Sequence, residues 1–168
     1  SSGREERGLY IHRVPTLVVS NGKKEMGRII ESPVESLEKD LAKIVGGSSY
    51  VAAYGDISGI IEFIKQTPAE KLTEAMPLQL PRWKETVKNV YHLNSLGYLL
   101  TTNGDWDKAI TAFTINTQLF PLDNTASKYL ADIYAKRGKT DLAKAYYRKI
   151  LEANPANLEV KTALDQLK

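Results

Sequence analysis

The fold is decided by the stretch LGYLLTTNGDWDKAITAFTINTQLFP (residues 96–121) and by its counterpart LADIYAKRGKTDLAKAYYRKILEANP (residues 130–155). The two stretches align without a gap at an offset of 34 residues, a spacing typical of helical repeats. The matched pairs are Leu96 and Leu130, Gly104 and Gly138, Asp107 and Asp141, Ala109 and Ala143, Phe113 and Tyr147, and Pro121 and Pro155. Each copy predicts a helix, a turn that contains glycine, a second helix and a proline stop, so the repeated unit is a helical hairpin.

Small residues recur where the two helices of each hairpin would cross. Gly97 and Ala109 occupy these positions in the first copy, and Ala131 and Ala143 occupy them in the second. Only small side chains let two helices approach closely, so larger ones would splay the hairpin. With these residues the chain resembles the tetratricopeptide repeat family over residues 90–168. The resemblance implies stacked hairpins that form an α-α superhelix and bind a protein partner on the concave face.

The resemblance also implies a binding face on the first helix of each repeat. Seven positions are expected to point inward: Tyr91, Asn94, Tyr98, Thr101, Thr125, Lys128 and Asp132. This mixed surface suits an extended peptide or a partner helix, and it predicts a protein-protein interaction module. A basic clamp for a terminal carboxylate is not expected, because Asp132 opposes Lys128. In an alternative interpretation, Tyr91 and Tyr98 pack on a neighbouring segment of the same chain.

The segment before the repeats predicts a β-hairpin. Residues 16–20 are apolar and mostly β-branched, and residues 25–31 can supply the partner strand. Between them, Asn21-Gly22 is the dipeptide favoured in a type I′ turn. The sequence therefore predicts two antiparallel strands joined by a tight turn.

A helix is predicted after the hairpin, with Ser32 as its N-cap and Glu35 completing a capping box. Its apolar face is expected to contain Val34, Leu37, Leu41 and Ile44. Gly46-Gly47 ends the helix, so the first unit spans residues 1–46. Two strands and one helix are marginal alone. The unit is expected to pack on later helices, to pair its strand edge with a second copy in a homo-oligomer, or to belong to a larger domain.

This first unit resembles the C-terminal half of a thioredoxin-fold domain. The resemblance rests on Val14-Pro15-Thr16, the strand and turn that follow, and residues 27–41. It implies that Pro15 is cis and that the loop of Val14, Pro15 and Thr16 holds extended peptide substrates. The redox dithiol of that family is absent from this sequence and would be expected upstream. An alternative function is therefore the C-terminal part of a thioredoxin-like oxidoreductase or chaperone whose repeats recruit substrates.

Residues 47–80 predict a helical connector or a decayed first repeat. Asp56 is expected to cap a short helix in which isoleucine recurs at positions 57, 60, 61 and 64. A second short helix is expected to start at residues 67–70, where the capping-box pattern recurs, and to stop at Pro77.

Residues 81–168 form the predicted repeat unit. From Pro81 the apolar pattern predicts one helix of about twenty residues that ends at Asn103-Gly104. Asn154-Pro155 is expected to start a final capping helix. The expected fold class is α+β, mostly α, with a partial thioredoxin-like hairpin and helix followed by a tetratricopeptide-type superhelix.

Composition excludes several kinds of site. The 168 residues contain no cysteine, which excludes disulfides, thiolate metal sites and thiol catalysis within this sequence. The 23 basic and 20 acidic residues form no block, so nucleic acid is not expected as a partner. His12 and His92 are far apart, so no metal, cofactor or catalytic role is predicted, and the chain is not expected to be an enzyme. No apolar run approaches the roughly 18 residues of a membrane span, and a cytoplasmic location is the default expectation.

Overall fold

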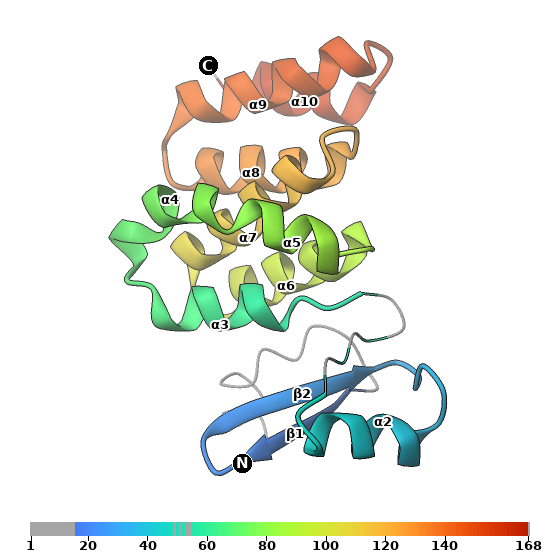
Figure 1. The fold of residues 1–168 in the computed structure, drawn as a ribbon. Coiled ribbons are helices and arrows are strands. Elements are labelled where there is room, and N and C mark those ends of the chain that lie inside the picture. Colours follow the sequence, from blue (N-terminus) through green and yellow to red (C-terminus); the bar gives the residue numbers. More distant parts are fainter. Residues whose placement is uncertain (1–15, 49, 51, 53–54, 168) are drawn as a thin grey trace.

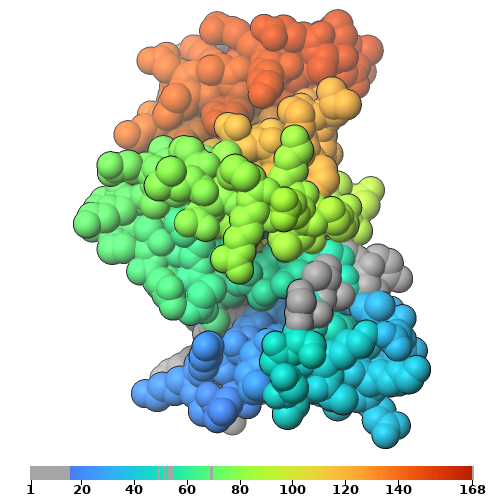
Figure 2. All heavy atoms as spheres, viewed as in Figure 1, coloured from blue at the N-terminus to red at the C-terminus, as the bar shows by residue number. Residues whose placement is uncertain are grey.

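The computed structural model describes residues 16–48, 50, 52 and 55–167. At one end of the chain a hairpin of β1 (Thr16–Asn21) and β2 (Lys24–Ile30) is followed by α2 (Leu37–Val45). The connecting segments are α3 (Ser58–Gln66), η1 (Ala69–Lys71), α4 (Leu72–Ala75), η2 (Met76–Leu78) and α5 (Leu80–Thr86). The array consists of α6 (Val90–Thr102), α7 (Trp106–Leu119), α8 (Asn124–Lys136), α9 (Thr140–Ala153) and α10 (Leu158–Gln166). Figure 1 shows the hairpin and α2 at one end, α8 to α10 at the other, and α3 to α7 between them, and Figure 2 shows the same arrangement with all atoms filled.

The hairpin is antiparallel, as predicted, but its turn is shifted by one residue. Asn21 pairs with Lys24, so the two-residue loop is Gly22-Lys23 and not Asn21-Gly22. Gly22 has a φ of 60°, whereas Lys23 is not among the residues with positive φ. Glycine with positive φ at the first loop position is the pattern of a type II′ turn, so the predicted type I′ turn is wrong.

A bulge in β2 decides which side chains share a face of the hairpin. The pairing steps from Val19 opposite Gly27 to Ser20 opposite Glu25, which leaves Met26 as the extra residue. In a regular strand, residues three apart point to opposite faces, and one extra residue reverses this relation. Glu25 and Arg28 therefore lie on one face, where Arg28 donates two hydrogen bonds of 2.6 Å from Nε and Nη2 to the Glu25 carboxylate.

The helix after the hairpin begins later than predicted. Its N-cap is Ser36, whose Oγ accepts a hydrogen bond from the Lys39 amide at 3.2 Å, and not Ser32. The Asp40 carboxylate accepts hydrogen bonds from the amides of Val34 and Glu35, so it holds the preceding segment outside the helix. The predicted apolar face is only partly correct: Ile44 is buried and packs against Gly27 of β2, whereas Val34 and Leu37 are each 50% exposed.

The long helix predicted from Pro81 is two helices in the structure. The chain leaves the helical path between α5 and α6, and Asn89 caps α6 by accepting a hydrogen bond from the Tyr91 amide at 2.9 Å. The break exposes the Thr86 carbonyl, which accepts a hydrogen bond from the Asp56 amide at 3.0 Å. Gly55, with a φ of 93°, makes this approach feasible, because an added Cβ would lie 2.6 Å from the Lys88 amide nitrogen.

The connector helix α4 ends at Ala75, just before Pro77, as predicted, and the chain continues through η2 into α5. One further helix boundary differs from the sequence prediction. The final helix begins at Leu158 and not at Asn154-Pro155, because the Asn157 side chain accepts a hydrogen bond from the Val160 amide at 3.1 Å. This boundary is set by a cap that propensity alone does not distinguish.

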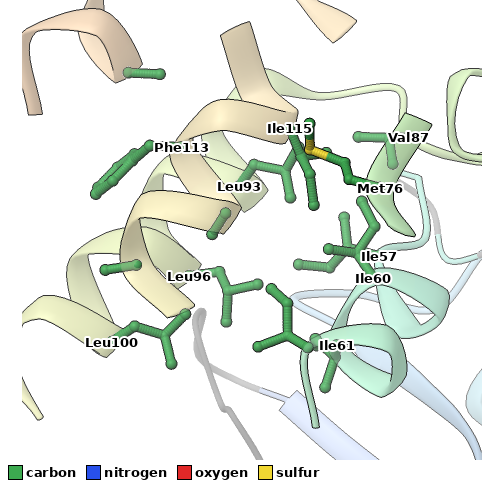
Figure 3. Packing of buried hydrophobic residues seen from close by; sticks show 14 of the residues in the cluster. Ile57, Ile60, Ile61, Met76, Val87, Leu93, Leu96, Leu100, Phe113 and Ile115 are labelled. Carbon is green, nitrogen blue, oxygen red and sulfur yellow. The ribbon is translucent and has the colours of Figure 1, made fainter. Parts of the chain in front are cut away.

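The main core joins the connector to the first repeat. The four isoleucines of residues 57–64 are buried. They pack in one cluster with Met76, Val87, Leu93, Leu96 and Ile115 (Figure 3). Both α3 and α5 contact α7, so the connector covers a face of the repeat that would otherwise be open. A second cluster is formed by Ala131, Ala143, Tyr147, Ile150 and Val160 from α8, α9 and α10.

The predicted small residues lie at the helix crossings. Ala109, Ala131 and Ala143 are fully buried. A Cβ added to Gly97 would lie 2.5 Å from the ring of Phe113 on the facing helix, a distance at which the ring would have to move. The hairpin of α6 and α7 therefore requires glycine at this position.

Candidate partner-binding face

The predicted face is built on the first helices of the two hairpins, α6 and α8. Tyr91 and Tyr98 are seven residues apart on α6, so they lie on the same side of the helix two turns apart. They are 64% and 56% exposed, and neither hydroxyl makes a hydrogen bond within the described part of the chain. Two large aromatic side chains on one exposed stripe form an apolar surface with free polar tips.

A row of aromatic rings connects this surface to the core. Tyr98 of α6 lies beside Tyr129 of α8, with ring centroids 6.4 Å apart and tilted. Tyr129 in turn stacks on the buried Phe113, with a centroid distance of 4.8 Å. The Tyr98 ring therefore packs against Tyr129, and this contact lowers the entropy cost of ordering the ring when a partner binds.

Lys128 and Asp132 form an ion pair that extends to the capping helix. The Lys128 ammonium lies 3.0 Å from Asp132 Oδ2 and 3.0 Å from Oε1 of Glu159 on α10. The hydroxyl of Tyr147 donates to Asp132 Oδ1 at 2.5 Å. Burial raises the pKa of Tyr147, and its bond to the Asp132 carboxylate raises it further. Burial alone would lower the pKa of Lys128, but its hydrogen bonds to Glu159 and Asp132 outweigh that effect and raise it.

The remaining polar residues of the predicted face are bonded within the chain. Asn94 is 8% exposed; its Oδ1 accepts from Asn116 Nδ2 at 2.7 Å and its Nδ2 donates to Asp123 Oδ2 at 3.3 Å. The other Asp123 oxygen accepts from Thr125 Oγ1 at 2.9 Å. The hydroxyl of Thr101 donates to the Gly97 carbonyl at 2.8 Å. These groups order the junction between α6, α7 and α8 more than they offer bonds to a ligand.

The structure thus arranges four of the seven residues in two subsets, while Asn94, Thr101 and Thr125 are bonded within the chain. Tyr91 and Tyr98 form an aromatic subset on α6, and Lys128 with Asp132 forms a charged subset on α8. Three neighbours were not predicted: Tyr129, Asp123 and Glu159. Tyr129 follows Lys128 directly, so a wider helical stripe would have included it. Glu159 belongs to the capping helix, and the repeat offset gives no indication that it reaches Lys128.

The loop of the thioredoxin-like prediction is mostly outside the described part of the chain. Val14 and Pro15 lie outside the described residues, as does His12, and Thr16 is the first residue of β1. Among the residues that the structure describes, no group of three or more His, Cys, Asp or Glu side chains is placed to hold a metal ion. None of the helices in the described ranges has both the length and the apolar composition that crossing a bilayer requires.

Two clefts lie away from the predicted face. One of about 550 Å³ separates the hairpin from α3 and is lined in part by Met26, Gly59 and Glu62. The other, of about 540 Å³, lies between the connector and the second helices of the repeats. Its lining includes Thr73 on α4, Ile110 on α7 and Leu142 on α9. Both clefts mix lysine or arginine with glutamate or aspartate, so neither selects a ligand by charge.

Comparison with known proteins identifies part of the array. A family model described as tetratricopeptide repeat matches residues 130–157, which run from α8 through α9 to the cap of α10. No curated protein matches the chain. The match agrees with the helical hairpin of α8 and α9 and with the small residues Ala131 and Ala143 at its crossing. Residues 130–157 are therefore a tetratricopeptide repeat in an array of helical hairpins.

Proposed function

We propose that this chain is a protein-interaction module in which the face of α6 and α8 binds a peptide or partner protein. Tetratricopeptide repeats mediate protein-protein interactions in general, and such a repeat is present at residues 130–157. One observation carries the location of the site. Tyr91 and Tyr98 expose more than half of their surface on one stripe, and their side chains make no hydrogen bond to the described residues.

Exposed aromatic residues of this kind are typical interface anchors. Tyrosine supplies a large rigid contact area at a low entropy cost, and it is enriched among the residues that dominate binding energy. In the alternative interpretation, Tyr91 and Tyr98 pack on a segment of their own chain; their exposures of 64% and 56% argue against this within the described residues. The face is therefore better explained as a surface for another molecule.

The test is partner capture with surface variants. The double variant Tyr91→Ala, Tyr98→Ala is expected to lose captured partners, with a decrease in affinity of roughly tenfold or more for each purified partner. Leu142→Ala is the matched control, because Leu142 is 45% exposed but lies on α9 at the opposite cleft. Far-UV circular dichroism should be unchanged for both variants. Unchanged capture by the tyrosine variant would contradict the proposal.

Two other roles stay predictions. In the first, the chain is non-catalytic itself but is the C-terminal part of a thioredoxin-like oxidoreductase or chaperone. It requires a cysteine pair encoded upstream of residue 1, and the upstream reading frame tests it. In the second, the strand edge of the hairpin pairs with a second copy of the chain. Sedimentation at tens of micromolar, a range chosen to populate weak dimers, would show only monomer if this prediction is wrong.

A further inference from the structure

The charges beside the tyrosine stripe are unequal in sign. On α8 and the adjoining part of α10 the face carries three carboxylates, Asp123, Asp132 and Glu159, and one ammonium group, Lys128. The helix α6 adds no Asp, Glu, Lys or Arg between Val90 and Thr102. The nearest further cation on α8 is Lys136, in its last turn, and counting it still leaves an excess of carboxylate. A ligand that approaches this face meets net negative charge.

The single ammonium group at the centre of the face is already neutralised. Lys128 lies between Asp132 and Glu159, at 3.0 Å from an oxygen of each. Asp123, in contrast, accepts hydrogen bonds from two neutral donors, the side chains of Asn94 and Thr125. The side chain of Glu159 is 72% exposed, so part of its carboxylate stays open to solvent. Around Lys128, negative charge is therefore available to a ligand, whereas the ammonium group is already paired.

The aromatic rings of Tyr91 and Tyr98 also favour a cationic ligand. The negative face of an aromatic ring attracts cations, and the planar guanidinium of arginine stacks on it while its N–H groups bind a carboxylate. Tyr98, supported by Tyr129 at 6.4 Å, offers such a ring next to the carboxylates of α8. An acidic or terminal carboxylate would instead have to displace Asp132 or Glu159 from Lys128.

Resting on the proposed function, we infer that the partner of this face is a cationic peptide segment that places arginine side chains on Tyr91 and Tyr98 beside the carboxylates of α8 and α10. Recognition requires no free chain terminus. Because the attraction is partly between exposed charges, binding weakens as ionic strength rises.

A peptide selection separates this inference from the function on which it rests. Random peptides displayed with both ends covered are selected on the wild-type chain and counter-selected on the Tyr91→Ala, Tyr98→Ala variant. The expected result is enrichment of peptides rich in arginine. Enrichment of tyrosine-dependent peptides that are acidic or uncharged would overturn the inference and leave the binding function intact. If no peptide depends on the tyrosines, the proposed function itself is wrong.

Defined peptides then measure the contribution of each group. Acetylated and amidated peptides of one length carry arginine, lysine or glutamate at the same positions among alanines, and their affinities are compared by fluorescence anisotropy. Arginine is expected to bind most tightly and glutamate most weakly. Tyr98→Ala should weaken binding of the arginine peptide about two- to thirtyfold. Equal or tighter binding of the glutamate peptide would contradict the inference.

A pair of charge variants provides the matched control. Glu159→Gln removes one carboxylate of the face and releases Lys128 from one partner. It should therefore weaken binding of the arginine peptide about two- to fivefold and strengthen binding of the glutamate peptide. Glu152→Gln makes the same change on an exposed position of α9 and should alter neither affinity. The inference fails if the two variants behave alike.

Discussion

The hairpin unit, formed by β1, β2 and α2, and the repeat array, formed by α6 to α10, are held together by different interactions. The array buries aliphatic, aromatic and small residues in two clusters. The hairpin unit buries two charged groups, Arg28 at 2% and Asp40 at 0% exposure, beside a few isoleucines. Substitutions that disturb packing should therefore destabilise the array most. Substitutions that remove a charge or a hydrogen bond should destabilise the hairpin unit most.

The largest effect is expected in the hairpin unit, at the buried ion pair. Glu25→Gln removes the carboxylate that binds the guanidinium of Arg28, a side chain with no exposed surface, and should cost about 3 kcal/mol of unfolding free energy. Chemical denaturation followed by far-UV circular dichroism measures this cost. Lys43→Gln is the control, because it breaks an exposed ion pair with Glu35 in the same unit and should cost little.

The same experiment tests whether the two regions unfold together. Trp83 and Trp106 lie in α5 and α7, so their fluorescence reports on the connector and the array and not on the hairpin unit. If Glu25→Gln shifts the circular dichroism transition and leaves the tryptophan transition in place, the hairpin unit unfolds separately. Coincident shifts would show that the two regions form one cooperative unit.

The second prediction concerns packing in the array. Gly97→Ala places a Cβ 2.5 Å from the ring of Phe113 and should lower the unfolding free energy by about 1–3 kcal/mol, despite the better helix propensity of alanine. Gly59→Ala is the matched control, because its Cβ would lie 3.6 Å from Trp83 Nε1, an ordinary contact, on an exposed part of α3. A denaturation midpoint that is equal or higher for Gly97→Ala would show that the crossing can relax.

The third prediction is a pH dependence that originates in α2. Burial would raise the pKa of Asp40, but hydrogen bonds from the Val34 and Glu35 amides and the Tyr50 hydroxyl outweigh it and lower the pKa. Its contribution to stability is thus present above the ordinary carboxyl pKa of about 4 and is lost as the pH falls through the lowered value. Asp40→Asn should destabilise the protein at neutral pH.

The decisive measurement for Asp40 is a comparison of denaturation midpoints across pH. The difference between the wild type and Asp40→Asn should narrow as the pH falls below about 4. Glu38→Gln, an exposed change on the same helix, is the control for the loss of a carboxylate from α2. The pKa of the neighbouring Glu35 is lowered by its bond to Lys43, and the charge of Asp40 opposes this shift, so Glu35 titrates in both proteins. A constant difference across pH would mean that Asp40 does not stabilise the fold through its charge.

The smallest effect is expected for an ion pair on the surface of the array. Arg137, at the end of α8, lies 2.5 Å from Asp107 at the start of α7, and the two side chains are 39% and 59% exposed. Exposed pairs of this kind contribute about 0.2–1 kcal/mol and are screened by salt. Arg137→Gln should therefore lower thermal stability slightly at low salt and have no effect at high salt. If Arg137→Gln lowers the stability as much as Gly97→Ala does, packing does not dominate the stability of the array.

The sequence predicts the array well because its periodic pattern reflects the packing itself. The pattern predicts Gly97, Ala109, Ala131 and Ala143 at helix crossings, and all four are buried, with Gly97 directly against Phe113. The apolar spacing could not reveal the break between α5 and α6. The pattern continues through Val87 to Leu93, and the break depends on the Asp56 amide, which lies 30 residues before the Thr86 carbonyl that it binds.

Buried polar groups explain the other differences. Ser32 and Ser36 are both good N-caps by residue type, and the choice between them depends on where the Asp40 carboxylate binds the backbone. At the candidate site the repeat offset predicts which positions share a face. It does not predict that Asn94 is bonded to Asn116, 22 residues away, since no local pattern links these two amides. The thioredoxin-like resemblance of the first unit stays a prediction.

The contact between Asp56 and Thr86 also has a mechanical consequence. The hydrogen bond closes residues 56 to 86 into a loop, and Gly55 packs against the Lys88 backbone. A force that pulls the hairpin away from the array reaches residue 55 along the chain. It therefore acts on the junction between Asp56 and Thr86 before it acts on α3, α4 and α5. The connector is then protected from the force and extends only after the junction opens.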